Sequence, residues 1–284
     1  MSVADSDTAV SSGAFRRPAA SLRALVTGYD GYRLAGYEPG IHLGLPSPCL
    51  TVIVTIGEPL DIAVQAAPGQ APGRYDTLAG GIATAPVTIR HDGNQHGVQL
   101  ALSPLGARAL LGVPTAALGA WVVGLEDLLG PDAGELTERL SLEPGWDGRF
   151  AILDEILTRR AEPAEIDPHL TRAWHLLVAG GGVRVADVAH EVGWSRRHLV
   201  NRFVAEYGVT PKDVVRLSRF DRSHRMLKGA AGATLADVSA VCGYYDQAHM
   251  ARDWRDLAGV PPSRWREIDP FSFVQDLDPE DGAR

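Results

Sequence analysis

Apolar and polar positions follow two different periods along the chain, and the period changes after Leu118. Between Ser21 and Leu118, short apolar runs rich in β-branched residues are separated by Gly and Pro. Runs of this length, bounded by turn residues, indicate short strands, and several such strands predict a small barrel or sandwich. The clearest runs are Leu50–Ile56, Pro59–Ala66, Pro86–Asp92 and His96–Ser103.

Beyond Leu118, apolar residues recur every three or four positions, as at Phe150, Leu153 and Ile156. This is the period of an amphipathic helix, so helices are expected over residues 125–140 and 148–160. The helical pattern resumes at Pro168 and continues to Arg266. These changes predict a disordered tail over 1–20, a domain over 21–160, a linker over 161–167, a helical domain over 168–268 and an acidic tail over 269–284.

The helical region contains an internal repeat. The segment "VADVAHEVG" ends at Gly193 and "LADVSAVCG" ends at Gly243, and both contain A-D-V-x-x-x-x-G. The similarity continues after each glycine, with one residue inserted in the second copy. The aligned pairs are Leu199 with Met250, Phe203 with Trp254, Gly208 with Gly259 and Pro211 with Pro262. A duplication of this length indicates one supersecondary unit used twice.

Each copy has the local signals of a helix-turn-helix. Gly193 and Gly243 are expected to end the first helix of each copy in a left-handed conformation. Ser195 and Asp246 then stand where a residue would cap the next helix. Thr234 and Asp237 have the spacing of a capping box, whereas Arg184 occupies the place of Thr234 in the first copy, which is therefore expected to be less well capped.

The charge of the chain is unevenly distributed. The formal net charge is −8. Residues 196–228, however, hold nine Arg and Lys against three acidic residues, a local charge of +6. A basic block in an acidic protein is typical of a local binding surface for a polyanion such as nucleic acid, although an Arg-rich solvated helix face has the same composition.

These residues resemble the C-terminal DNA-binding domain of AraC/XylS-type transcription regulators. The match covers roughly residues 166–268. It is carried by Gly243, Tyr244, Met250, Arg252, Trp254, Gly259, Pro262 and Arg266, by Ala189, Gly193, Ser195, Leu199, Phe203, Gly208 and Pro211, and by Arg216, Arg219, Met226 and Leu227 between them. Met250 and Trp254 stand where the family usually has Phe, Ser223 where it has Ala, and Asn201 where most members have Arg.

The resemblance implies an α+β protein. Its N-terminal domain would be β-rich and barrel-like with two trailing helices. Its C-terminal domain would be all-α, with two helix-turn-helix units joined by a long helix. The second helix of each unit would enter the major groove of double-stranded DNA, so that one chain reads two successive grooves.

Exposed residues near the start of each such helix are the candidates for reading bases, because Arg suits guanine, Asn and Gln suit adenine, and an apolar group suits the thymine methyl. They are Arg196, Arg197, Val200 and Asn201 in the first unit, and Gln247, Ala248 and Arg252 in the second. Contacts to phosphate are expected from His198, Lys212, Arg216, Arg219 and His249. The structural core of the motif is expected to be Leu199, Phe203, Met250 and Trp254, with Gly208, Gly259, Pro211 and Pro262 shaping its ends.

The N-terminal region resembles the sensor and dimerisation halves attached to such regulators, and His96–Gly112 resembles a segment of AraC-like proteins with an uncharacterised N-terminal domain. A small-molecule effector, a second copy of the chain and RNA polymerase are the further partners expected. His42, His91 and His96 are interpreted as surface histidines near a turn, because no carboxylate or thiolate spacing supports a metal site. Cys49 and Cys242 are interpreted as packed apolar residues.

One alternative from another class stays open: an enzyme or DNA-repair protein that uses the same helical domain to dock on DNA. A repair protein would need a cysteine-rich acceptor or a metal site, and only Cys49 lies outside the helix-turn-helix region. No catalytic constellation, phosphate loop or cofactor motif is recognised, so an enzyme is not expected. Neither a membrane-length apolar run nor a signal-peptide core is found, and the expected location is the cytoplasm.

Overall fold

The computed structural model describes residues 9–180, 183–229 and 233–268. Its strands are β1 (Val10–Arg16), β2 (Val26–Ala35), β3 (Gly40–Gly44), β4 (Leu50–Thr55), β5 (Leu60–Val64), β6 (Gly73–Tyr75), β7 (Thr77–Gly80), β8 (Val87–His91), β9 (Gln95–Leu102) and β10 (Val122–Gly124). A short 3-10 turn, Ala20–Leu22, lies between β1 and β2.

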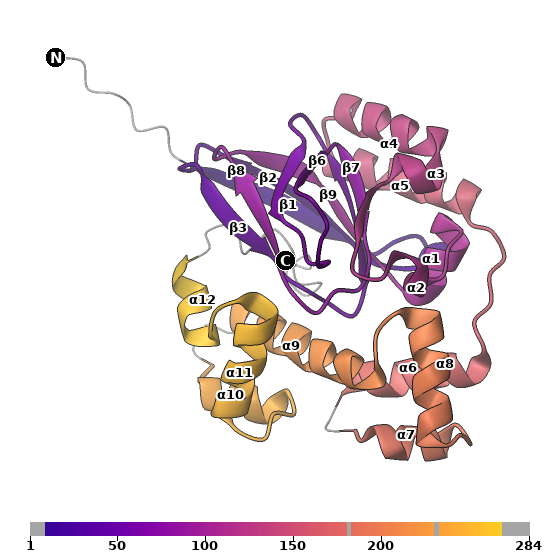
Figure 1. Ribbon diagram of the computed structural model, residues 1–284. Coiled ribbons are helices and arrows are strands. Elements are labelled where there is room, and N and C mark those ends of the chain that lie inside the picture. Colours follow the sequence, from indigo (N-terminus) through magenta and orange to yellow (C-terminus); the bar gives the residue numbers. More distant parts are fainter. Residues whose placement is uncertain (1–8, 181–182, 230–232, 269–284) are drawn as a thin grey trace.

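The helices of the N-terminal part are α1 (Pro104–Leu111), α2 (Thr115–Leu118), α3 (Glu126–Leu129), α4 (Pro131–Leu142) and α5 (Trp146–Arg160). Those of the C-terminal part are α6 (Pro168–Ala179), α7 (Val185–Glu191), α8 (Arg196–Tyr207), α9 (Pro211–Gly229), α10 (Leu235–Val241), α11 (Gln247–Ala258) and α12 (Pro262–Ile268). The expected order, a β-rich part followed by an all-helical part, is confirmed (Figure 1).

Two antiparallel sheets form the N-terminal domain. One has the order β1-β2-β9-β4-β7-β10 and the other β3-β8-β5-β6. Alternation along β4 divides its side chains between the two faces of its sheet. Val52 and Val54 face a core shared with the helices, while Ile53 joins Ile62 and Ile89 in a small core between the sheets. The barrel-like domain is thus a pair of packed sheets with helices covering one face (Figure 1).

The N-terminal end of the described chain differs from the disordered tail expected over residues 1–20. Val10–Arg16 form β1, which pairs with β2 in antiparallel register from Val10 opposite Ala35 to Arg16 opposite Tyr29. The Arg16 guanidinium also pairs with Asp154 of α5. An edge strand that is largely exposed has no apolar alternation, which is why the sequence pattern missed it. Residues 1–8, and the acidic tail expected over 269–284, lie outside the described residues.

The segment expected to be one helix over 125–140 is two helices, α3 and α4. Gly130 separates them at a φ of 57°, and Pro131 begins α4 at the position where a missing backbone N–H costs least.

Further upstream, α1 and α2 occupy a region expected to be β-patterned. Ser103 caps α1 by accepting a hydrogen bond from the Gly106 N–H, and Pro104 follows it at the first helical position.

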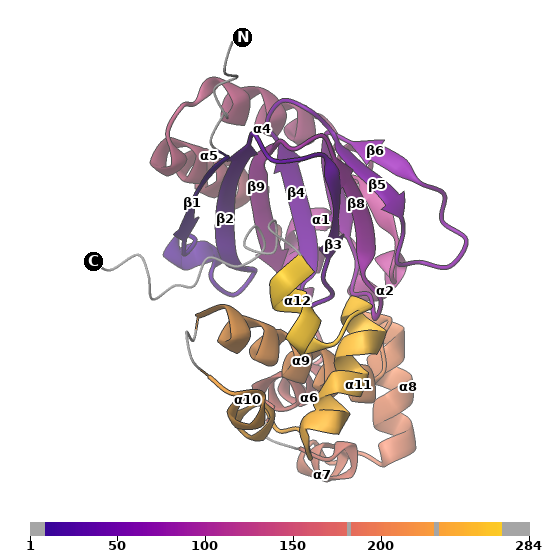
Figure 2. The same cartoon turned by 90° about the vertical axis from the view of Figure 1, so that its left-hand side faces the viewer.

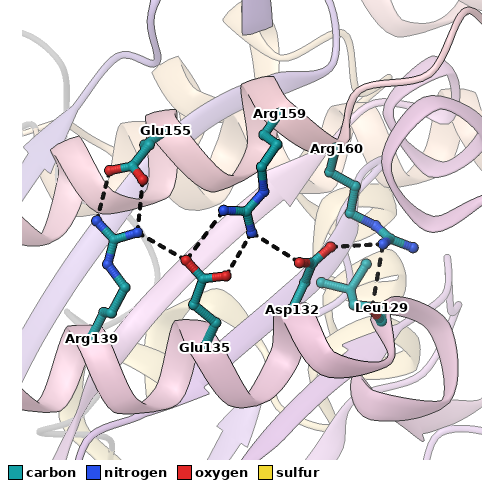
Figure 3. Close-up of polar contacts among 7 residues, drawn as sticks. All are labelled: Leu129, Asp132, Glu135, Arg139, Glu155, Arg159 and Arg160. Atoms are coloured by element: carbon teal, nitrogen blue, oxygen red, sulfur yellow. Dashed lines mark hydrogen bonds and ion pairs between the residues drawn. The ribbon is translucent and has the colours of Figure 1, made fainter.

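Helices α4 and α5 are joined side by side by a ladder of ion pairs (Figure 3). Its arginines and carboxylates alternate along the two helices: Arg139 with Glu135 and Glu155, Arg159 with Glu135 and Asp132, and Arg160 with Asp132. The two arginines beside it lower the pKa of the Glu135 carboxyl. Arg160 also donates to the carbonyl oxygens of Leu128, Leu129 and Leu110, so it ties the ends of α3 and α1 to α5.

The N-terminal and C-terminal domains are in direct contact through α8. The Arg108 guanidinium of α1 donates two hydrogen bonds of 2.7 Å to the two carboxylate oxygens of Glu206 on α8. Gly208 follows α8 with a φ of 75°, and a Cβ at this position would lie 3.0 Å from the Cα of Ala116 in α2. Glycine is therefore required at 208 both by the backbone conformation and by the close approach of α2.

Candidate nucleic-acid interface

The two helix-turn-helix units consist of α7 with α8 and of α10 with α11, and α9 joins them (Figure 2). In both turns a glycine has the left-handed conformation, with a φ of 73° at Gly193 and 79° at Gly243. The next residue closes each turn, because Trp194 N–H donates to Ala189 O and Tyr244 N–H donates to Ser239 O. The repeat in the sequence therefore corresponds to a repeat in backbone structure.

The second helix of each unit begins at a side-chain cap. Ser195 Oγ accepts a 3.2 Å hydrogen bond from His198 N–H, and Asp246 Oδ1 accepts a 2.6 Å bond from His249 N–H. The first helices differ in the way the sequence indicates: Thr234 and Asp237 form a reciprocal capping box, whereas Arg184 makes no side-chain cap. These bonds fix where α8 and α11 start and thus which of their residues come first.

The residues expected in the core of the motif are fully buried. Leu199, Phe203, Met250 and Trp254 have essentially no exposed surface. In the first unit Phe203 stacks on Trp174 of α6, and in the second the Trp254 ring meets Phe220 of α9 edge to face. Gly208 and Gly259 end α8 and α11 in the left-handed conformation, and Pro211 and Pro262 begin α9 and α12 with buried rings.

The residues expected to read bases lie on the surface. Arg196, Arg197 and Asn201 are exposed and Val200 is half-buried on α8, while Gln247, Ala248 and Arg252 are exposed on α11. Within the described part of the chain, the side chains of Arg196, Arg197 and Arg252 have no hydrogen bond or ion pair. Helices α7 and α10 lie on the side of the helical domain away from the sheets in both views (Figures 1 and 2). The N-terminal domain contacts α8 at the opposite end from Arg196.

The residues expected at phosphates fall into two groups. His198 and Lys212 are exposed. Arg216 and Arg219 instead lie between α9 and α11, where Arg216 pairs with Asp253 at 2.8 Å and with Asp256 at 2.5 Å, and Arg219 pairs with Asp253 at 3.2 Å. His249 is half-buried, and its Nδ1 accepts from the Tyr245 N–H. Arg216 and Arg219 thus have a structural role, since they connect α9 to α11.

One exposed residue of the second unit was not singled out from the sequence. Tyr245, in the turn before α11, has 92% of its surface exposed, whereas Tyr244 beside it is buried. The Arg219 guanidinium lies 5.3 Å from the centre of the Tyr244 ring. The Tyr-Tyr pair after Gly243 could have indicated this exposure, since neighbouring side chains in a tight turn point in different directions and only one of the two can be buried.

The histidines of the N-terminal domain lie in different environments from those expected. His42 is buried rather than on the surface, and His91 and His96 are half-buried. Burial, with His91 as a smaller influence, lowers the pKa of His42 to about 3. Burial and the neighbouring Arg149 and Arg33 lower the pKa of His96 to about 4. Within the described residues, no group of three or more His, Cys, Asp or Glu side chains is arranged to hold a metal ion.

The two thiols are also placed by the fold. Cys242 is buried in the second unit, and burial raises its pKa. Cys49 is half-buried just before β4, and its backbone N–H donates to Ser47 Oγ. Within the described residues, no helix has both the length and the apolar composition required to cross a bilayer.

Comparison with known proteins agrees with this geometry. Residues 188–268 match the family model described as "Helix-turn-helix domain". An uncharacterised HTH-type transcriptional regulator, YbfI of Bacillus subtilis, is 29% identical over 68 residues. That match covers 24% of this chain and 24% of YbfI, so the two proteins are alike over about a quarter of the relative's length.

Solved structures extend the similarity to the whole fold. ToxT from Vibrio cholerae has a TM-score of 0.52 at 12% identity, over 84% of this chain and 96% of ToxT. Its structure with a bound unsaturated fatty acid has a TM-score of 0.51 at 11% identity, over 87% and 94% of the two chains. At these identities the likeness shows a shared fold. With the family model, it confirms that the C-terminal region is an AraC-type helix-turn-helix domain attached to a β-rich domain.

Proposed function

We propose that this chain is a sequence-specific DNA-binding transcription regulator that reads two successive major grooves with α8 and α11. The observation that carries the proposal is the pair of capped helices, each presenting at its exposed N-terminal end polar side chains that have no partner among the described residues. Recognition helices of helix-turn-helix proteins contact base edges with this part of the helix.

Each exposed side chain has a role in the proposal. Arg196, Arg197 and Arg252 suit the O6 and N7 atoms of guanine, and Asn201 and Gln247 suit the N6 and N7 atoms of adenine. Val200 and Ala248 suit a thymine methyl. Phosphate contacts are proposed for His198, Lys212, Arg216, Arg219 and His249. Arg216 and Arg219 would make them either while still paired with Asp253 or after a DNA phosphate replaces the Asp253 carboxylate as their partner.

The proposal assigns the two halves of the chain different tasks. Residues 168–268 would bind DNA, and residues 21–160 would bind a small-molecule effector or a second copy of the chain, with residues 161–167 as the linker. The unsaturated fatty acid bound to ToxT is one precedent for a small molecule bound by a protein of this fold. RNA polymerase is proposed as the partner through which DNA binding affects transcription, and the cytoplasm as the location.

The competing proposal is an enzyme or repair protein that docks on DNA, and neither thiol of the described residues supports it. A repair acceptor thiol must be reactive, and a thiol is reactive as the thiolate. Cys242 is buried with a raised pKa, and Cys49 is half-buried just before β4, with its backbone N–H bonded to Ser47 Oγ. The regulator is therefore the function supported best.

The test is selection of binding sites from a random DNA pool by the full-length protein and by variants. Arg197→Ala and Arg252→Ala should each cost about 1–3 kcal/mol on the best site and relax preference at one position. The two affected positions should lie about ten base pairs apart. Arg74→Ala, which removes an exposed arginine of β6 in the N-terminal domain, serves as the matched control and should leave the selected site unchanged.

If wild type, Arg197→Ala and Arg252→Ala select the same site with the same preferences, the assignment of base reading is wrong and the docking role is favoured. Binding should also weaken steeply with added salt, because neutralised phosphates release counterions. Affinity that does not depend on salt would contradict the proposal as a whole.

A further inference from the structure

One open end of the two-sheet domain contains a cavity of about 590 Å³, lined by both polar and apolar side chains. The ends of β2, β4, β5, β8 and β9 surround it, and its walls include Arg33, His96, Tyr32, Thr55 and Asp61. Cavities of this volume hold small-molecule ligands in other proteins. The distribution of charge around the cavity indicates what kind of ligand it would take.

Arg33 and His96 form one corner of this cavity. They are directly opposite each other in the antiparallel pairing of β2 with β9, so their side chains lie on the same face of the sheet. Arg33 is exposed, and among the described residues its guanidinium has no hydrogen bond or ion pair. His96 meets the Trp146 ring of α5 edge to face, with 5.7 Å between the ring centres.

A buried arginine lies behind His96. The Arg149 side chain is only 6% exposed, and its Nη1 lies 3.0 Å from His96 Nε2. Its Nε donates to Leu140 O at 3.1 Å, and its guanidinium lies 4.7 Å from the centre of the Trp146 ring. These partners satisfy hydrogen-bonding groups but do not neutralise the charge.

No carboxylate of the described residues lies within ion-pair distance of Arg149. Glu143 is close enough to affect its pKa, but the Glu143 carboxylate accepts a hydrogen bond from the Gly145 N–H. A buried cation without a counter-ion is costly, and proteins usually pair such a group. The excess of positive charge at this corner is therefore unusual.

The contact with Arg149 also determines the state of His96. A guanidinium only donates hydrogen bonds, so His96 Nε2 must accept, and the ring is neutral with its proton on Nδ1. A neutral His96 with an Nδ1–H is a hydrogen-bond donor. The corner thus combines a donor, the free fork of Arg33 and the buried charge of Arg149.

The other arginines of the cavity are already paired. Arg90 lies 3.5 Å from Asp61, and Arg74 lies 3.8 Å from Glu58. Positive charge without a partner is thus confined to the corner formed by Arg33, His96 and Arg149. The rest of the wall combines the polar groups of Thr55 and Asp61 with apolar side chains such as Ile56 and Leu60, which suits the hydroxyl groups and the carbon skeleton of a small organic ligand.

We infer that this cavity binds a small polar organic anion whose carboxylate or phosphate sits between Arg33 and His96, in front of the buried charge of Arg149. The planar fork of Arg33 suits either group bidentately. This inference rests on the proposed effector-binding role of the N-terminal domain and names the chemical class of the effector.

The experiment measures the melting temperature of the full-length protein against increasing citrate, acetate or inorganic phosphate, with chloride holding the ionic strength constant. A ligand that binds only the folded state raises the melting temperature in a saturable way. At least one of these anions should do so with wild type. Citrate or acetate acting alone would indicate a carboxylate ligand, and inorganic phosphate acting alone a phosphorylated one.

Arg33→Gln is the test variant, because Arg33 has no bonds within the described structure whose loss would disturb folding. It should raise the dissociation constant of the anion about tenfold or more. Arg33→Lys, which keeps the charge but loses the fork, should fall between wild type and Arg33→Gln. Arg74→Gln, an arginine of the same cavity that is paired with Glu58, is the matched control and should change the constant less than twofold.

Two results would overturn the inference. One is the absence of saturable stabilisation of wild type by all three anions, and the other is equal affinity of Arg33→Gln and wild type. DNA binding by the same preparations, measured without added anion, separates this outcome from the proposed function. Arg33→Gln should bind DNA as wild type does, so lost anion binding with retained DNA binding concerns the cavity alone.

Discussion

The indole Nε1 of Trp254 donates a 2.9 Å hydrogen bond to the Ser223 hydroxyl, and both side chains are completely buried. Ser223 in turn donates to Phe220 O at 2.8 Å, so the three residues tie α11 to α9. Positions 223 and 254 are two of those at which the sequence departs from the AraC/XylS pattern of Ala and Phe. The serine at 223 suits the tryptophan at 254, because the buried indole N–H needs a hydrogen-bond acceptor that an alanine side chain lacks.

The first prediction concerns this pair. Ser223→Ala should cost about 1–3 kcal/mol, since it leaves the Trp254 N–H buried without a partner. Trp254→Ala should cost about 3–5 kcal/mol as a large-to-small change in a packed core. The double variant Ser223→Ala/Trp254→Phe should cost less than the sum of its two single changes. Urea unfolding of wild type, Ser223→Ala, Trp254→Phe and the double variant measures this coupling, and strict additivity would show that the hydrogen bond contributes nothing.

The second prediction concerns the contact between the domains. Arg108 and Glu206 form a bidentate pair that is partly buried, with side-chain exposures of 33% and 13%. Glu206→Gln should reduce the unfolding free energy by about 1 kcal/mol and make residues 161–167 more accessible to protease, because α8 loses its tie to α1. Glu191→Gln, which breaks an exposed pair with Arg172, is the control and should change neither quantity measurably. Equal cleavage rates in all three proteins would mean that the pair does not hold the domains together.

The third prediction is a pH dependence. Burial, and then His91, lower the pKa of His42 to about 3 in the folded protein, whereas a histidine of the unfolded chain titrates near 6.5. Below pH 6.5 the unfolded state therefore binds a proton that the folded state does not. Stability from His42 is fully present above pH 6.5 and is lost as the pH falls toward 3, by up to ~1.4 kcal/mol per pH unit.

The measurement is the slope of the unfolding free energy between pH 7 and pH 5. His42→Gln should flatten this slope, whatever it does to absolute stability, because glutamine takes up no proton. His175→Gln removes an exposed histidine of α6 and should leave the slope as in wild type. An unchanged slope in His42→Gln would contradict the prediction.

The fourth prediction concerns Arg216, whose guanidinium is paired with Asp253 and Asp256. Arg216→Ala should cost about 1–3 kcal/mol of stability, because the largely buried Asp253 loses one of its two arginine partners. It should also weaken binding to all DNA sequences alike and lower the salt slope by about one unit. Asp256→Asn, which removes only the exposed partner, should cost less than 1 kcal/mol.

Two measurements on Arg216→Ala separate its two roles. Thermal unfolding reports the contact between α9 and α11, and binding to a random DNA duplex at several salt concentrations reports the phosphate contact. A variant that loses stability but keeps the salt slope of wild type would leave Arg216 as a structural residue only.

The signals that predicted the fold correctly were local ones. Gly193, Ser195, Gly243 and Asp246 act within one turn of their own position, so the ends of the helices could be inferred from neighbouring residues. Ser103 and Pro104 gave the same kind of signal for α1. Helix α1 was nevertheless not expected, because residues 21–118 as a whole have the short runs and turn residues that are typical of strands.

Features that depend on distant residues were not predictable in this way. The ion pairs of Arg216 involve residues of α11, which follow it by a whole helix and a turn. A basic residue on a half-exposed helix face has the same sequence pattern whether it meets phosphate or a carboxylate. The burial of the Arg149 charge could not be predicted either, because its place behind His96 depends on how α5 packs against the sheet.

The fold holds α8 and α11 in different ways. Helix α8 is fixed at its C-terminal end to the N-terminal domain, by Arg108 and by the backbone of α2 at Gly208. Helix α11 is held through α9, by Arg216 and by the Ser223–Trp254 hydrogen bond. The position of α8 is therefore set by the N-terminal domain, and the position of α11 is set by the connecting helix α9. If both helices bind one DNA site, we predict that a change of one base pair between its two halves acts first on the contacts of α11 with α9, Arg216 with Asp253 and Trp254 with Ser223.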